Sequence, residues 1–142
     1  MKVSESKKIL CLCTENTVRS VMLEALLSPY AQVESAGINP ASFANPLTSE
    51  VLKNNNLNFD VADPKGVDEI SIEAFDLIIT VSESAHNYLK GYDEAGNVEI
   101  EYWITAVPPV LGEVSREACL DAYQNIFDEL TRHIQNRFEI IS

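Results

Sequence analysis

Basic residues are scarce in this sequence, which has 10 lysines and arginines against 22 aspartates and glutamates and a formal net charge of −12. So little positive charge argues against a nucleic-acid partner or an anionic membrane surface, because Lys and Arg must neutralise phosphates in both cases. Long apolar runs are also absent, since no stretch approaches the roughly 18 residues of a membrane-spanning helix. Residues 1–8 lack the apolar run of a signal peptide. We therefore expect neither nucleic acid nor a membrane as a partner.

Cysteine is scarce too, and the three cysteines are an odd number. Such a count indicates thiol chemistry in a reducing compartment more than a disulfide framework, so we expect a cytoplasmic protein. The two histidines, His86 and His133, stand singly without metal-ligand spacing, and we expect no metal site. At 142 residues the chain is expected to form a single domain over residues 1–142.

One stretch near the N-terminus concentrates the chemistry. A short apolar run ends at Cys13, five residues follow, and apolar residues recur at helical spacing from Arg19, which predicts a strand, a loop and a helix. Unpaired N–H groups and the helix dipole at such a helix start suit a tetrahedral oxyanion. The same field favours the thiolate of Cys13, and Arg19 can bind two oxygens of the anion. The other members of the expected oxyanion loop are Thr14, Glu15, Asn16, Thr17 and Val18.

Strands and helices alternate along the rest of the chain. We expect strands at 7–13, 32–36, 75–81 and 98–102, and helices at 19–28, 46–55, 82–90 and 113–141, with a brief helix within 68–74. This alternation predicts an α/β fold with a parallel sheet covered by helices on both faces. Ligands of such sheets bind at the carboxyl ends of the strands, where Cys13 lies.

The motif Cys13-x5-Arg19-Ser20, with Asn16 inside it and Glu24 after it, resembles the signature of the low-molecular-weight protein tyrosine phosphatase superfamily. That superfamily includes arsenate reductases of the same fold. The likeness continues through residues 35–38, 46–47, 65–70, 76–80 and 103–109. It implies a three-layer sandwich whose four-stranded parallel sheet has the flavodoxin-like order 2-1-3-4. It also implies a cysteine-dependent phosphatase or arsenate reductase.

The resemblance assigns roles to several polar residues. Cys13 is the expected nucleophile, and the Ser20 hydroxyl is expected to donate to its sulfur. Asn16 and Ser35 are expected to hold the oxyanion loop in place. In arsenate-reductase relatives Glu24 binds a monovalent cation together with these two residues, and an equal alternative here is that Glu24 lies on a solvated helix face. No other cofactor is implied.

The general acid that the family uses is missing. Relatives carry an aspartate directly before a proline in the loop after the fourth strand, but here Val107 precedes Pro108. A valine transfers no proton, and general acid catalysis is commonly worth ~10² to 10⁴ in rate. Slippage of the loop could bring in Glu101 or Glu113 instead. Trp103, a few residues earlier, matches the arsenate-reductase branch.

Glu15 is a second departure, because the family usually has glycine at this place. A carboxylate that faced the anion would repel it, so we expect Glu15 to point outward, since an unpaired buried carboxylate is unfavourable. If the position requires a positive φ, a residue with a Cβ would also strain the loop.

The cysteines limit the redox chemistry. Val18 stands where many relatives have a second cysteine, residues 81–97 contain none, and Cys11 and Cys119 are expected in the core. Any arsenate reduction would therefore need an external thiol such as glutathione, mycothiol or glutaredoxin. Three functions stay open: an arsenate reductase, a phosphatase of phosphotyrosine proteins or small esters, and an acid-deficient protein that binds phosphate, arsenate or phosphoproteins with little turnover.

Overall fold

The sheet of the protein has four parallel strands in the order β2-β1-β3-β4, and a computed structural model describes residues 7–91 and 98–138. The strands are β1 (Lys8–Cys13), β2 (Gln32–Gly37), β3 (Leu77–Thr80) and β4 (Glu99–Tyr102). The helices are α1 (Arg19–Leu27), α2 (Pro46–Asn54), α3 (Glu83–Tyr88) and α5 (Arg116–Arg137). The predicted α/β class and strand order are confirmed.

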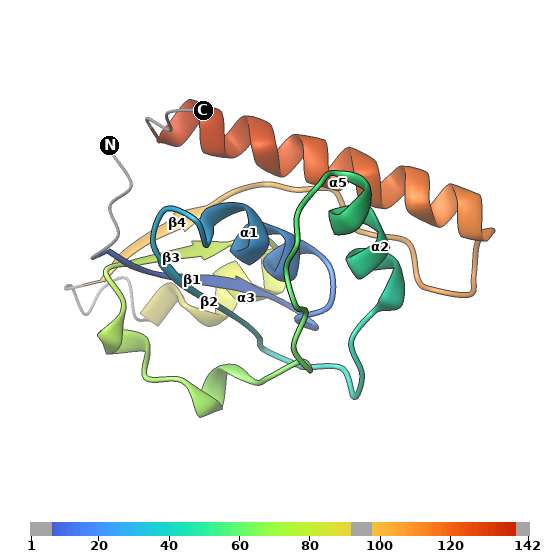
Figure 1. Ribbon diagram of the computed structural model, residues 1–142. Helices are drawn as coiled ribbons and strands as arrows, with labels where there is room; N and C mark the ends of the chain where they lie inside the picture. Colours follow the sequence, from blue (N-terminus) through green and yellow to red (C-terminus); the bar gives the residue numbers. More distant parts are fainter. Residues whose placement is uncertain (1–6, 92–97, 139–142) are drawn as a thin grey trace.

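The central strand β1 shows why helices cover both faces of the sheet. Ile9, Cys11 and Cys13 point into one buried cluster, which contains side chains of α1, α2 and α5. Leu10 and Leu12 point into the other, which contains side chains of α3. A strand buried on both faces is typical of parallel sheets. In Figure 1, α5 lies across α1 and α2 on one side of the sheet, and α3 lies on the other.

Helix α5 is the longest element and covers one face of the sheet. Its buried side chains recur at helical spacing: Cys119, Tyr123, Ile126, Phe127, Leu130 and Ile134. The predicted start at residue 113 is wrong by three residues, because the Ser115 side chain caps the helix by accepting from the N–H of Ala118 at 3.1 Å. The predicted end, residues 139–141, lies outside the described residues. No helix in the described ranges is long and apolar enough to cross a membrane.

Among the other elements, three differ most from the prediction, and one of them is α3, which covers Glu83–Tyr88 instead of 82–90. Strand β3 is shorter than 75–81, since the Asp76 carboxylate already accepts from the backbone N–H of Lys8 at 2.9 Å before the strand begins. The brief helix expected within 68–74 is instead two 3-10 turns, Val67–Glu69 and Ile72–Ala74. One turn contributes Val67 and the other Ile72 to the buried cluster that contains Leu10 and Leu12.

Candidate active site

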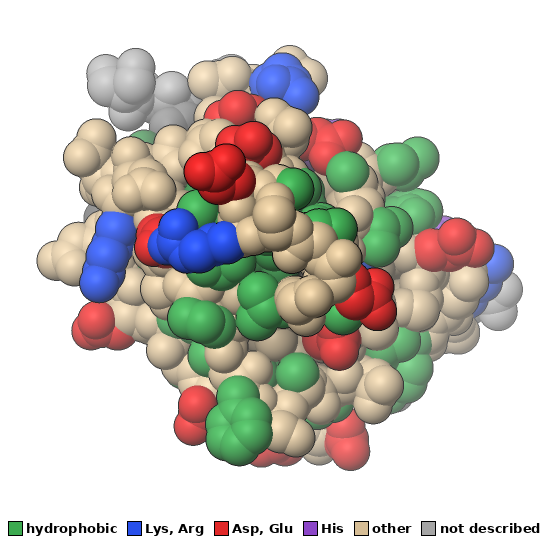
Figure 2. Space-filling model, turned by 90° about the vertical axis from the view of Figure 1, so that its right-hand side faces the viewer, with side chains coloured by type: hydrophobic (Ala, Val, Ile, Leu, Met, Phe, Trp, Pro, Cys, Tyr) green, Lys and Arg blue, Asp and Glu red, His purple; other side chains and the backbone are tan. Residues whose placement is uncertain are grey.

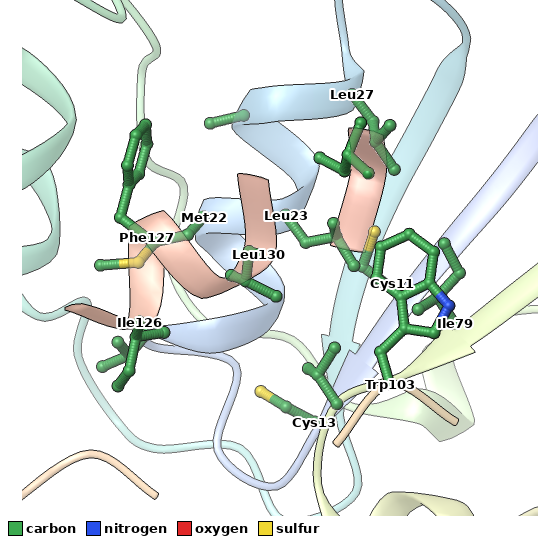
Figure 3. Close-up of a cluster of buried hydrophobic side chains, with 14 of the residues drawn as sticks. Cys11, Cys13, Met22, Leu23, Leu27, Ile79, Trp103, Ile126, Phe127 and Leu130 are labelled. Atoms are coloured by element: carbon green, nitrogen blue, oxygen red, sulfur yellow. The ribbon is translucent and has the colours of Figure 1, made fainter. Parts of the chain in front are cut away.

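Cys13 is the last residue of β1, and its side chain lies at the base of the loop that leads to α1. The residue is only 3% exposed. Its Sγ lies 2.9 Å from the Ser20 Oγ and accepts from the backbone N–H of Asn16 at 3.3 Å. Figure 3 shows Cys13 at the border of the buried cluster, while Cys11 lies deeper, near Trp103. The sequence therefore brings one thiol to the loop and keeps the other in the core.

Asn16 holds the loop from inside. Its Nδ2 donates to the Ser20 Oγ at 2.9 Å and to the Ser35 Oγ at 3.0 Å, and its Oδ1 accepts from the backbone N–H of Lys65 at 3.0 Å. Asn16 also takes the left-handed conformation, with a φ of 58°, which asparagine tolerates better than most residues. Glu15 does not have a positive φ and is exposed. Its outward orientation is as expected, and the predicted strain at this position is absent.

Gly37 lies in the stretch 35–38 that resembles the family, but the sequence analysis assigned it no role. It ends β2 directly against the loop: a Cβ on Gly37 would come within 2.6 Å of the Thr14 carbonyl oxygen and 2.9 Å of the Asn16 nitrogen. The backbone N–H of Ile38 donates to the Cys13 carbonyl at 3.1 Å. The loop therefore packs against the end of β2, and only glycine allows this close approach.

We expect Gly37→Ala to push the loop out of place, because the three nearest atoms that its Cβ would meet all belong to the backbone. Overpacking of this kind is unfavourable by about 1–3 kcal/mol. The main effect should be a loss of phosphate affinity, measured by titration calorimetry, with a smaller effect on the melting temperature. Gly91→Ala is the matched control, since a Cβ there meets nothing within 4 Å. Unchanged phosphate binding by Gly37→Ala would show that the loop does not depend on this contact.

Arg19 begins α1 and is 9% exposed. Val18, the residue before it, makes no side-chain capping bond, which leaves first-turn N–H groups available to a ligand. Burial lowers the pKa of Arg19, while the nearby Cys13 and Tyr102 raise it; an arginine keeps its proton in any case. The first turn of α1 therefore supplies backbone donors and a permanent cation at the end of the loop that begins at Cys13.

A cavity of about 380 Å³ lies over Arg19. Val107, which is 79% exposed, forms one wall, so the residue that replaces the family's acid does face the loop. The other wall comes from the start of α3, where the Thr14 hydroxyl lies 2.7 Å from the Ser84 Oγ and donates to the Ser82 Oγ at 3.1 Å. This hydroxyl cluster was missed in the sequence, because nothing local links residue 14 to residues 82 and 84.

Neither alternative acid lies in this cavity. Glu101 instead accepts hydrogen bonds from the Arg137 Nε at 2.9 Å and the Trp103 Nε1 at 3.1 Å. Burial alone would raise the pKa of Glu101, but the hydrogen bonds from Arg137 and Trp103 lower it below its ordinary value. A carboxylate so held is a poor proton donor. Glu113 lies in the turn before α5, so neither carboxylate lies at the place of the missing acid, and their recruitment by slippage of the loop stays a prediction.

Helix α5 fixes the chain that leads to Val107. The Glu129 carboxylate accepts from the backbone N–H of Ala106 at 2.9 Å, and the His133 Nε2 lies 2.9 Å from the Ile104 carbonyl oxygen. The ring of Trp103 stacks on that of His133 at 5.3 Å. Glu129 and His133 are one helical turn apart, so together they hold this segment at two backbone groups.

Glu24 belongs to the support of the loop. Its carboxylate accepts from the Ser35 Oγ at 2.5 Å, and burial raises the pKa of Glu24. Together with Asn16 and Lys65, these residues line a small cavity of about 60 Å³. The alternative of a solvated helix face is therefore wrong. Among the described residues, no group of three or more His, Cys, Asp or Glu side chains is placed to hold a metal ion.

The comparison with protein families agrees with this geometry. The family model for "Low molecular weight phosphotyrosine protein phosphatase" matches residues 8–138. The chain belongs to this family. No curated protein sequence matches the chain. The low molecular weight phosphatase family thus accounts for the order of the strands in the sheet.

Solved structures similar to this member of the family include both reductases and phosphatases. An arsenate reductase from Archaeoglobus fulgidus is 26% identical, with 90% of this chain and 96% of that chain covered and a TM-score of 0.68. A thioredoxin-dependent arsenate reductase from Corynebacterium glutamicum is also 26% identical, with 93% and 63% covered and a TM-score of 0.63. A low molecular weight protein tyrosine phosphatase from Streptococcus pyogenes shares the fold at 19% identity, with 94% of both chains covered and a TM-score of 0.69.

Proposed function

We propose that this protein is a cysteine-dependent enzyme in which the Cys13 thiolate attacks a tetrahedral oxyanion, with arsenate as the first candidate substrate. The observation that carries the proposal is the position of the buried Cys13 Sγ, 2.9 Å from the Ser20 hydroxyl and 3.3 Å from the N–H of Asn16. Donors that surround a sulfur stabilise its thiolate, and the thiolate is the nucleophile.

The remaining residues of the loop hold the anion. Arg19 binds two of its oxygens, and the backbone N–H groups between Thr14 and Val18 bind the others. The Ser20 hydroxyl donates to the sulfur before attack, while Asn16 and Ser35 keep the loop in place. The other members of the loop are Glu15 and Thr17. Val107 lines the cavity over Arg19 and Pro108 lines the groove beside the loop, while Trp103, earlier in the same segment, is buried in the core.

Arsenate is the first candidate because Val107 provides no proton for a leaving alkoxide, whereas hydrogen arsenate carries protons on its own oxygens. Cys13 attacks arsenic, and one hydroxyl leaves as water. An external thiol then attacks the Cys13 sulfur, forms a mixed disulfide and releases arsenite, which keeps the electron pair of the As–S bond. A second thiol frees Cys13. Two thiols become one disulfide while As(V) becomes As(III), and the reducing cytoplasm supplies the thiols.

The thiols must come from outside the chain. Cys11 and Cys119 are 0% and 1% exposed, and Val18 takes the place of the second cysteine in the loop. A glutathione, mycothiol or glutaredoxin thiol is therefore the proposed reductant, in contrast to a relay through an internal disulfide.

A second candidate is a phosphatase that acts on aryl phosphate esters such as phosphotyrosine. The observation that favours it is an apolar groove of about 370 Å³ beside the loop, lined by Phe43, Val110 and Leu111. An inorganic anion makes no use of such a surface. Phenolates leave without much help, so this activity tolerates the missing acid better than alkyl phosphatase activity does.

Three substrates separate these functions. Hydrolysis of 2,4-dinitrophenyl phosphate, whose leaving group hardly needs a proton, should clearly exceed that of p-nitrophenyl phosphate. Arsenite formation should require one of the three external thiols. Tight phosphate binding without any turnover would indicate an acid-deficient binding protein. If phosphate did not bind and no substrate turned over, the proposal would be rejected.

We also propose that a monovalent cation binds at Glu24. The donors there are oxygens, as hard cations prefer: the Glu24 carboxylate, the Ser35 hydroxyl and the Asn16 amide oxygen line one small cavity. Lys65 is paired with Glu34 at 2.9 Å, so within the described ranges the Glu24 carboxylate has no ion-pair partner. A bound potassium ion would offset the burial of this charge.

The pH dependence of stability tests this cation site. Because burial raises the pKa of Glu24 above its usual 4.5, the contribution of the protonated group to stability is complete below pH 4.5 and is lost as the pH rises through the raised pKa. In choline chloride, which supplies no potassium, the stability of Glu24→Gln should not show this decrease as the pH rises. Potassium chloride should raise the free energy of unfolding of the wild type at neutral pH but not that of Glu24→Gln. Equal stability of the wild type in both salts would exclude the cation.

A further inference from the structure

The groove beside the oxyanion loop has an unusual lining. Its volume is about 370 Å³, and its walls include Phe43 on one side and Val110 and Leu111 on the other. Tyr123 and Glu15 also line it, and Glu15 is the only charged residue among the described residues that do so. The groove meets the loop at Glu15, Thr17 and Val18, whereas the cavity over Arg19 meets it at Thr14.

The apolar side chains around this groove are exposed to solvent. Phe43 is 81% exposed, Val110 60% and Leu111 49%. Val107, in the neighbouring cavity, is 79% exposed. Figure 2 views the side on which the chain between β4 and α5 lies, and hydrophobic side chains are interspersed there with acidic ones. Apolar groups gathered on one surface mark a contact site, and a bare inorganic anion would leave them unused.

Glu15 and Tyr123 line the groove together. The pKa of Tyr123 is raised to about 12, first by burial, with hydrogen bonding to Cys119 and the charge of Glu15 adding to the effect. The Tyr123 hydroxyl accepts from the Asn45 Nδ2 at 2.8 Å. Within residues 7–91 and 98–138, the lysines and arginines form their ion pairs with carboxylates other than that of Glu15.

We propose that this groove binds a phosphorylated polypeptide, and that Glu15 selects substrates with a basic residue next to the phosphorylated side chain. The proposal rests on the capture of the anion above Cys13, the first half of the proposed function. An apolar residue of the same segment would pack on Phe43 and Leu111.

Electrostatics give the reason for a basic neighbour. The chain has a net charge of −12, and its long-range field opposes the approach of a phosphoryl dianion. A carboxylate at the edge of the loop adds a close repulsion that salt screens incompletely. A cation attached to the substrate pairs with Glu15 and lowers both penalties, while the phosphoryl group still meets Arg19. Glu15 thus disfavours acidic phosphopeptides and favours basic ones.

Binding of non-hydrolysable peptides tests this proposal apart from turnover. Each peptide carries phosphonomethyl-phenylalanine beside a leucine, with an arginine in one peptide and a glutamate in the other. Fluorescence anisotropy of the full chain should show that the arginine peptide binds about fivefold tighter or more. Glu15→Gln should reduce this ratio to about twofold or less. Glu117→Gln is the control, because Glu117 is exposed in the first turn of α5 and does not line the groove.

Equal binding of the two peptides, no binding of either, or a preference that survives in Glu15→Gln would overturn the proposal. Phe43→Ala provides a second variant that leaves the core intact, and it should weaken both peptides without changing their ratio. Hydrolysis of 2,4-dinitrophenyl phosphate by the same preparation reports on the proposed function. Hydrolysis without a basic preference would remove only this inference, whereas a Glu15-dependent preference without hydrolysis would remove only the catalysis.

Discussion

Cys13→Ser is expected to lower the turnover of every substrate by about 10⁴-fold or more, as the loss of a catalytic nucleophile commonly does. A serine hydroxyl stays protonated under the same conditions, so it cannot replace the thiolate. The Ser20 hydroxyl and the N–H of Asn16, which lie 2.9 Å and 3.3 Å from the sulfur, remain in the variant. Phosphate should therefore still bind. Steady-state hydrolysis of 2,4-dinitrophenyl phosphate and titration calorimetry with phosphate measure the two effects separately.

Cys119→Ala is the matched control for this experiment. Cys119 is a second buried thiol, 1% exposed on the inner face of α5, and it has no place in the loop. Its removal should lower the melting temperature slightly and leave kcat near the wild-type value. Turnover that survived in Cys13→Ser and disappeared in Cys119→Ala would show that Cys13 is not the nucleophile.

Val107→Asp is expected to raise kcat for p-nitrophenyl phosphate by about 10² or more, the usual contribution of a general acid. Val107 is 79% exposed in the cavity over Arg19, so an aspartate meets no steric barrier there. The hydrogen bond from the Ala106 N–H to Glu129 keeps the preceding residue in place. The gain should decline as the pH rises through the pKa of the new carboxyl, because only the protonated form donates. Hydrolysis of 2,4-dinitrophenyl phosphate should change little.

Val107→Asn separates proton donation from a change of shape or polarity, since its amide has nearly the same size as the carboxyl. The asparagine variant should keep the wild-type rate with both substrates. Equal gains in the two variants would mean that the side chain acts through the solvent or the loop, and that no proton is transferred from residue 107.

Local spacing was enough to predict much of this molecule. The alternation of apolar runs and helical periods fixes an α/β class, and five residues between Cys13 and Arg19 fix a loop before a helix. The buried position of Cys11 follows from its alternation with Leu10 and Leu12 along one strand. These features depend on neighbours in the sequence, and a periodic pattern reports on such neighbours directly.

Contacts between distant segments could not be predicted in the same way. The close approach of Gly37 to Thr14 depends on the exact pairing of β2 with β1. The hydrogen bond from the Ala106 N–H to the Glu129 carboxylate depends on where α5 crosses the sheet. The departure at Glu15 was visible in the sequence, but its consequence was not, because the left-handed residue of the loop turned out to be Asn16. One-residue differences in backbone conformation leave no periodic signal.

The burial of Cys11 and Cys119 also determines how the protein responds to hydrogen peroxide. The proposed thiolate at Cys13 would be oxidised to a sulfenic acid, which in many proteins is rescued when a neighbouring thiol of the same chain condenses with it. The other two thiols of this chain are free and buried in the core. Recovery then depends on small thiols in the surroundings, and when they are depleted further oxidation to the sulfinic acid inactivates the protein for good.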